Sequence, residues 1–159
     1  MPGEKRQAEV GMHRRSGLMI LVLLIISGGS TPGCSGSAAG GGQHGMAMAP
    51  LEEMPVEVQV APVVVRQAYQ FAAANPGVFT QIPCYCGCAV KGHTSNYACY
   101  VAGVEPDGKT IYDLHALACT ICVDITHDTV RLLKQGKSIQ EIQAYVDSTY
   151  AMYGPSTGP

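Results

Sequence analysis

The clearest pattern of apolar and polar positions lies in the last third of the chain, where it predicts two antiparallel helices. Over residues 113–135, opening on Asp113 as a cap, apolar residues recur at helical spacing. The expected buried stripe comprises Leu114, Ala118, Ile121, Ile125 and Leu132. Gly136 suits the residue that ends a helix. Ser138 and Glu141 then have the spacing of a capping box for a second helix. The buried side expected for that helix comprises Ile139, Ile142, Val146 and Tyr150.

Upstream of this helical pair, the pattern predicts one more helix and a short β-hairpin. The helix is expected over residues 64–74, where the sequence Asn75-Pro76-Gly77 ends it. Two short strands, at 97–104 and 109–112, flank a Pro-Asp-Gly turn in which proline presets φ and glycine accepts a positive φ. The predicted fold class is therefore mostly α: a small, Cys-rich single domain with an N-terminal helix, a short β-hairpin and a C-terminal αα-hairpin.

The N-terminal residues carry a different pattern, that of an export signal. Four basic residues precede an apolar run at 18–26, which is shorter than the ~20 residues that a helix needs to cross a bilayer. Cys34 follows at the position where a bacterial lipoprotein is cleaved and acylated. Residues 1–34 therefore predict an exported lipoprotein, anchored at Cys34 to the outer face of the cytoplasmic membrane. Cleavage near Ala38 is the alternative, and it leaves a secreted protein.

The remaining segments are assigned by composition. Residues 35–62 are expected to form a flexible Gly/Ala/Pro linker, residues 63–153 the Cys/His-rich domain, and residues 154–159 a disordered tail. Within the linker, His44, Met46 and Met48 offer imidazole and thioether ligands that suit Cu(I), although such residues also populate ordinary linkers. The net charge is −2, and no basic run follows the leader, so nucleic acid is excluded as a partner.

The densest chemical pattern is a group of six cysteines within the predicted domain: Cys84, Cys86, Cys88, Cys99, Cys119 and Cys122. Cysteines two apart do not readily bond to each other, because a disulfide needs Cα atoms about 5.5–6 Å apart and a specific dihedral angle. The first three thiols must therefore find partners elsewhere or bind a metal. On the long predicted helix, His115, Cys119 and Cys122 fall at i, i+4 and i+7 and share one strip. His93 follows the triplet closely and is expected to lie beside the site.

Three functions fit these residues. In the first, a soft metal ion, with copper as Cu(I) ahead of zinc as Zn(II), binds to thiolates and imidazoles. Its expected ligands are Cys84, Cys86, Cys88, Cys119, Cys122, His115 and His93, with Cys99 either a ligand or structural. In the second, Cys119 and Cys122 form a thiol–disulfide redox pair, activated by the start of a helix. In the third, three disulfides staple an extracytoplasmic binding module, which is the default outside the cytoplasm.

The small number of disulfide partners available to the cysteine triplet modestly favours a metal site over disulfides. If Cys119 closed on Cys122, two cysteines of the triplet would have no partner. We do not expect an enzyme, because no serine or carboxylate constellation accompanies the thiols, and no C-x-x-C-H haem motif occurs.

Beyond these arguments, the chain resembles a known family. The hexapeptide Pro83-Cys-Tyr-Cys-Gly-Cys88, followed by His115-x-x-x-Cys119-x-x-Cys122 and Gly136-Lys-Ser-Ile-Gln-Glu-Ile142, is similar to the bacterial PCYCGC-motif lipoproteins. The likeness spans residues 64–150. The resemblance implies export, anchoring and a shared set of cysteines and histidines. The family is described as of unknown function, so the resemblance implies no substrate.

Overall fold

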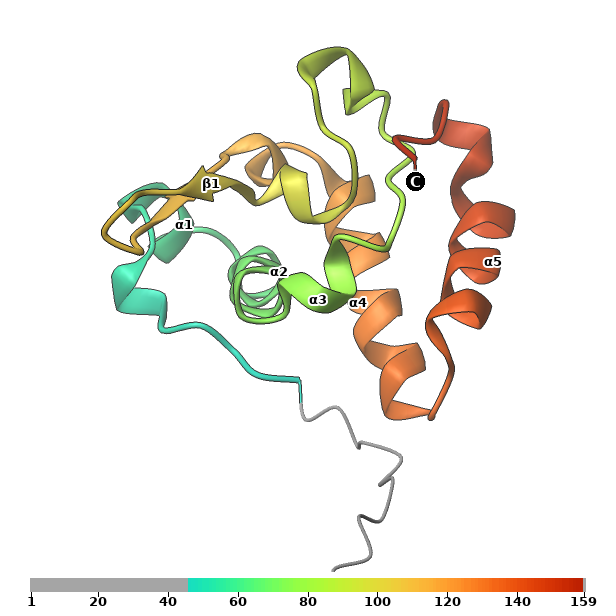
Figure 1. Ribbon diagram of the computed structural model, residues 1–159, viewed down its shortest axis with the longest axis horizontal. Coiled ribbons are helices and arrows are strands. Elements are labelled where there is room, and N and C mark those ends of the chain that lie inside the picture. The colour runs from blue at the N-terminus through green and yellow to red at the C-terminus, as the bar shows by residue number, and fades with distance from the viewer. Residues whose placement is uncertain (1–45, 159) are drawn as a thin grey trace, which may run out of the picture. The chain divides into compact units, whose positions relative to one another are not determined.

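The computed structural model of the chain describes residues 46–158, and the mostly α class with one hairpin is confirmed (Figure 1). The helices are α1 (Val56–Gln59), α2 (Val63–Ala74), α3 (Pro76–Phe79), α4 (Thr120–Lys134) and α5 (Ile139–Tyr150). Strands β1 (Val101–Val104) and β2 (Thr110–Tyr112) pair antiparallel. The predicted export signal, Cys34 and His44 lie outside the described residues. No helix within 46–158 combines the length and the apolar character that a membrane span requires.

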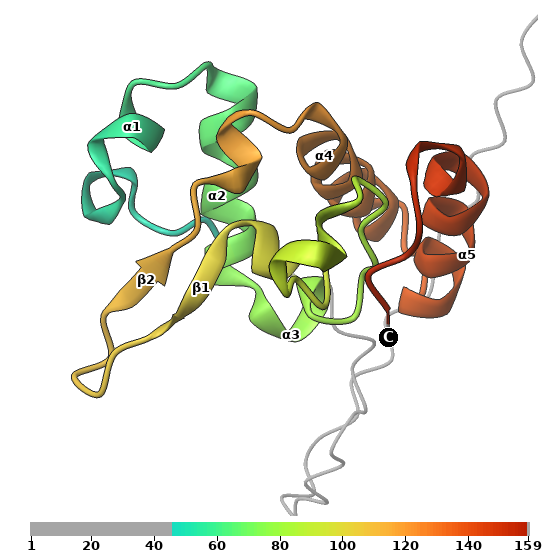
Figure 2. The same cartoon turned by 90° about the horizontal axis from the view of Figure 1, so that it is seen from above.

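The three longer helices, α2, α4 and α5, pack around one core. Helix α2 lies against α4, and α4 lies against α5, while the β-hairpin extends on the side away from α5 (Figure 2). The core between them is built on large side chains that are fully buried: Tyr69, Phe79, Ile82, Tyr100, Ile125, Ile142 and Val146. This packing places the loop that follows α3 over the N-terminal end of α4.

The second half of the predicted linker is ordered rather than flexible. Pro50, Pro55 and Pro62 each stand immediately before a helical turn, because their fixed φ suits the position at which a helix starts. Met54 and Val58 are buried as a result. The helices here are too short to show a periodic pattern, which explains why the sequence predicted a flexible linker. Met46 packs partly against the core and Met48 is exposed.

The long predicted helix starts later than expected. Helix α4 begins at Thr120, with Cys119 as its cap residue, and residues His115–Leu117 form a separate 3₁₀ turn. The Asp113 carboxylate caps this short turn, accepting a hydrogen bond from the His115 backbone N–H at 2.7 Å. Leu114 and Ala118 are consequently exposed instead of lying on the buried stripe. The predicted helical strip through His115 was therefore wrong in its geometry.

The predicted start of the β-hairpin was wrong, whereas the predicted start of α5 was right. Residues Tyr97–Cys99, expected as strand, form a 3₁₀ turn ahead of β1. The capping box of α5 is confirmed: the Ser138 hydroxyl accepts from the Glu141 backbone N–H, and the Glu141 carboxylate accepts from the Ser138 N–H at 2.8 Å. Ile142, Val146 and Tyr150 of α5 are buried as predicted.

A single carboxylate, Asp128, fastens α4 to α5. It accepts hydrogen bonds from the hydroxyls of Tyr145 at 3.1 Å and Tyr150 at 2.8 Å, and from Arg131 at 2.7 Å. Burial raises the pKa of the Asp128 carboxyl, but these hydrogen bonds outweigh burial and lower the pKa overall. A carboxyl whose pKa is lowered by folding stabilises the fold above the pKa of the unfolded chain, about 3.9, and loses this contribution as the pH falls through the folded pKa.

We expect Asp128→Asn to lower the free energy of unfolding at pH 7 by about 1–3 kcal/mol, because the charged acceptor of hydrogen bonds from three side chains is lost. The difference from the parent protein should shrink below about pH 4. Urea denaturation at pH 7 and at pH 3 measures both effects. Asp124→Asn, an exposed change of the same charge on the same helix, is the control. A loss that stays constant with pH would contradict the assignment.

Candidate metal centre

The described cysteines converge on one place from four separate elements. Cys84 and Cys86 lie in the loop after α3, and Cys88 starts the 3₁₀ turn that follows it. Gly87 adopts a left-handed φ of 76°, which a residue with a side chain rarely tolerates, and the loop turns there. Cys99 ends the turn before β1, while Cys119 and Cys122 occupy the start of α4. His115 reaches the same place from its own 3₁₀ turn.

Three of the sulfur atoms form a triangle. The Sγ atoms of Cys84, Cys86 and Cys122 are each 3.5 Å from the other two. A tetrahedral zinc ion with Zn–S bonds of about 2.3 Å holds its sulfurs about 3.8 Å apart, so the triangle is close to the spacing of thiolates on a shared ion. A disulfide joins each sulfur to only one other, and all six described cysteines are free. The spacing therefore suits a shared metal better than paired sulfurs.

Further donors extend the triangle. His115 Nε2 lies 3.5 Å from Cys86 Sγ, and Cys88 Sγ lies 3.7 Å from Cys99 Sγ. Ligand atoms lying within 4.8 Å of one another form three overlapping sets of four. The sets are Cys84, Cys86, Cys99 and Cys122; Cys86, Cys88, Cys99 and His115; and Cys86, His115, Cys119 and Cys122. Cys86 belongs to all three. Cys99, which the sequence left as structural or metal-binding, belongs to two of them.

Burial divides these donors into an inner and an outer part. Cys84, Cys88, Cys99 and Cys122 are buried, whereas Cys86, Cys119 and His115 remain partly exposed. The site therefore has an interior closed to water and one edge that reaches solvent.

The sulfur contacts also separate the acidities of the thiols. Hydrogen bonds from Cys122 and Cys84 lower the pKa of the Cys86 thiol, because neighbouring S–H groups stabilise its thiolate. Donation toward Cys84 and Cys86 raises the pKa of the Cys122 thiol, which keeps its proton. Burial raises the pKa values of Cys88 and Cys119. Since a thiolate is the form that binds a metal, the contacts around Cys86 favour its metal-binding form.

His93 lies beside the donor sets without belonging to any of them. Its ring meets that of His115 edge-on, with centroids 5.1 Å apart. Nε2 lies 3.2 Å from the Asp113 carboxylate, and Nδ1 is buried without a hydrogen-bond partner. Asp113 thus holds both His93 and the backbone of His115, as carboxylates do for histidines around metal sites. Sequence reasoning treated Asp113 only as a helix cap and missed this position.

A buried network of polar side chains holds the backbone of Cys122 in place. Its backbone carbonyl accepts a hydrogen bond from the Asn96 side-chain amide at 3.1 Å and lies 2.8 Å from the Tyr100 hydroxyl. The Asn96 side-chain carbonyl accepts from the Thr126 hydroxyl at 2.8 Å. All three side chains of the network are completely buried. Nothing in the sequence distinguishes Asn96 from an ordinary loop asparagine, so no signal was available there.

The predicted disordered tail is docked onto the cysteine loop. Residues 154–158, which we call the C-terminal strap, lie beside this loop in both views (Figures 1 and 2). The Thr157 N–H donates to the Cys84 carbonyl at 2.9 Å, and its hydroxyl accepts from the Cys84 N–H at 2.9 Å. Tyr85, between two cysteines of the motif, donates to Asp147 of α5 at 2.6 Å. The expectation of disorder was therefore wrong for the described part of the tail.

The strap lies so close to the cysteine loop that residue 154 has no room for a side chain. A Cβ atom at this residue would lie 2.9 Å from the Tyr85 carbonyl oxygen and 3.2 Å from the Gly87 nitrogen, both backbone atoms. We expect Gly154→Ala to cost about 1–3 kcal/mol in unfolding free energy, because the strap or the loop must shift. Urea denaturation measures the loss. Gly77→Ala, where the added Cβ meets nothing within 4 Å, is the matched control. Equal stabilities of the two variants would contradict close docking.

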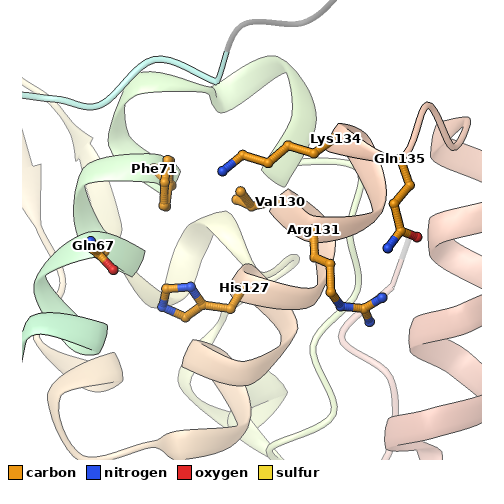
Figure 3. A pocket seen from close by; sticks show the side chains of 7 residues that line it. All are labelled: Gln67, Phe71, His127, Val130, Arg131, Lys134 and Gln135. Carbon is orange, nitrogen blue, oxygen red and sulfur yellow. The ribbon is translucent and has the colours of Figure 1, made fainter.

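A surface hollow between α2 and α4 lies apart from the cysteines (Figure 3). Its lining is mixed apolar, amide and basic: Gln67, Phe71, His127, Val130, Arg131, Lys134 and Gln135. His127 contacts the Val64 carbonyl through Nε2 at 2.8 Å. No cysteine lines the hollow, so it contributes nothing to the candidate centre.

Comparisons with known proteins agree with the motif. Neither the curated proteins nor the solved structures gave a match to this chain. A family model, described as a protein of unknown function with a PCYCGC motif, matches residues 19–158 and thus includes the cysteine loop, the start of α4 and the strap. The chain therefore belongs to the PCYCGC family.

Proposed function

We propose that this protein is an exported lipoprotein that binds a soft metal, Cu(I) in preference to Zn(II), through its cysteines and His115. The observation that carries the proposal is the sulfur triangle of Cys84, Cys86 and Cys122, with His115 Nε2 at 3.5 Å from Cys86. The donors are six thiols and one imidazole, and none of the three sets contains a carboxylate. Thiolates select Cu(I) and Zn(II) over hard ions, and a donor set dominated by sulfur favours Cu(I).

The competing functions receive less support from the same geometry. A redox pair needs a sulfur reserved for its partner, but the Cys122 sulfur, which is fully buried, lies 3.5 Å from the sulfurs of both Cys84 and Cys86 as well. Three structural disulfides would require three separate sulfur pairs. The triangle shares its sulfurs, and only Cys88 and Cys99 stand as a pair, at 3.7 Å.

A competition titration tests the metal. The full chain, reduced and kept anaerobic, is titrated with Cu(I) in the presence of a chromophoric Cu(I) chelator, and separately with Zn(II). We expect the chain to take Cu(I) from the chelator. Cys122→Ser should weaken this binding strongly, whereas Cys34→Ser, which removes a cysteine of the leader, should leave it unchanged. A fully reduced chain that takes no Cu(I) from the chelator would refute the proposal.

The anchor is tested separately, since it rests on the leader sequence alone. Expressed in a bacterium that processes lipoproteins, the parent chain should sediment with membranes and incorporate labelled fatty acid. Cys34→Ser should abolish the label. Equal labelling of the parent and the variant would exclude Cys34 as the attachment site.

A further inference from the structure

The candidate centre offers more donors than one ion can use. Seven side chains contribute to the three sets, whereas a tetrahedral ion binds four ligands and Cu(I) in thiolate sites takes no more. A single ion in the set of Cys84, Cys86, Cys99 and Cys122 would leave Cys88 buried beside it without a role. The excess of donors is thus a property of the site that binding of one ion does not explain.

The number of donor sets to which each residue belongs points to one ligand that is shared between metal ions. Cys86 occurs in all three sets, Cys99, Cys122 and His115 occur in two, and the other cysteines occur in one. A thiolate sulfur has three lone pairs and can bind two metal ions at once, whereas an imidazole nitrogen has one and binds a single ion. Cys86 is therefore the donor best placed to bridge, and His115 can only be a terminal ligand.

Charge favours several ions as well. Most of these sulfurs are buried, and uncompensated thiolates in an interior cost free energy. One monovalent ion neutralises only one of four surrounding thiolates. Two or more ions that share thiolates bring the charges of metal and ligand closer to balance. Each ligating thiol releases its proton to solvent when Cu(I) binds, and no electron is transferred.

We propose that the site holds a polynuclear Cu(I)–thiolate cluster of at least two ions, in which the Cys86 sulfur bridges the metals. The inference rests on the proposed function, because it specifies how many ions the same residues bind. The outer edge of Cys86, Cys119 and His115 leaves the cluster partly open to solvent, while Cys84, Cys88, Cys99 and Cys122 enclose the rest.

The test uses the full chain, reduced and anaerobic, loaded with Cu(I) in slight excess and freed of unbound metal. Native mass spectrometry counts the ions on each chain, and X-ray absorption detects copper–copper scattering. The expected result is two or more Cu(I) per chain with a copper–copper path. One Cu(I) per chain without that path would overturn the cluster and leave the proposed function standing. No bound Cu(I) would overturn both.

Two cysteine variants test the bridge. Cys86→Ser is expected to halve the number of bound ions or lower it further and to abolish copper–copper scattering. Cys119→Ser is the matched control, because Cys119 is also partly exposed but belongs to one set only, and it should retain the copper–copper path. Far-UV circular dichroism of both metal-free variants checks that they fold. Retention of the scattering path in Cys86→Ser, or its equal loss in both folded variants, would overturn the bridging role.

Discussion

Loading the reduced chain with Cu(I) is expected to raise its melting temperature by about 10 °C. A ligand that binds the folded state alone at a thousand times its Kd stabilises that state by about 4 kcal/mol. For a domain of this size, 1 kcal/mol corresponds to roughly 4 °C or more. Together these figures give a shift of about 16 °C, and because thiols of the unfolded chain also bind copper, which reduces the gain, we expect about 10 °C. Differential scanning calorimetry under anaerobic conditions measures the shift.

The control for this shift is reversal by an excess of a strong Cu(I) chelator, which should restore the lower melting temperature. Copper that is bound without any change in melting temperature would mean that the folded and unfolded chains hold it equally well. That outcome would contradict a site assembled by the fold, because the donors come together from separate elements only in the folded chain.

The second large effect is expected at Asn96. Asn96→Ala should lower the free energy of unfolding by about 3 kcal/mol, because the buried Cys122 carbonyl and the Thr126 hydroxyl each lose a partner and a small cavity remains. Removing outer partners of ligands typically weakens metal affinity 10–100-fold, and we expect a loss of about this size for Cu(I). Urea denaturation and chelator competition measure the two effects.

Asn75→Ala provides the comparison for Asn96. Asn75 donates through its side-chain amide to the carbonyls of Ala47 and Phe71, so the same chemical group is removed away from the cysteines. We expect this variant to lose about 1 kcal/mol and to keep its Cu(I) affinity. If Asn96→Ala kept the parent affinity while being less stable, the network would support the fold without positioning Cys122.

Local signals explain which parts of the fold could be predicted. The capping box at Ser138 and Glu141 and the apolar spacing in α5 are properties of adjacent residues, and they hold whatever surrounds them. The start of α4 could not be predicted in the same way. An aspartate caps a single 3₁₀ turn as readily as a long helix, and only the packing around Asp113 and His93 selects the short turn.

The sequence predicted which residues belong to the candidate metal centre better than it predicted how those residues are arranged. The spacing of the cysteine triplet indicated that its thiols lack comfortable disulfide partners, which is a local argument. The place of Cys99 in two donor sets, and of His93 outside all of them, depends on distances across the fold. The strap was missed because a sequence rich in glycine and proline is typical of disordered chain. Here Gly154 instead permits close contact with Tyr85.

The strap also provides a remote indicator of the centre. Thr157 binds no metal, yet its amide hydrogen is held by the carbonyl of Cys84, 73 residues away in the sequence. Any change that loosens the cysteine loop exposes this amide to solvent. Its rate of deuterium exchange therefore follows the order of the loop. An isotopic label at one threonine therefore reports on the order of the cysteine loop, without a probe on any cysteine.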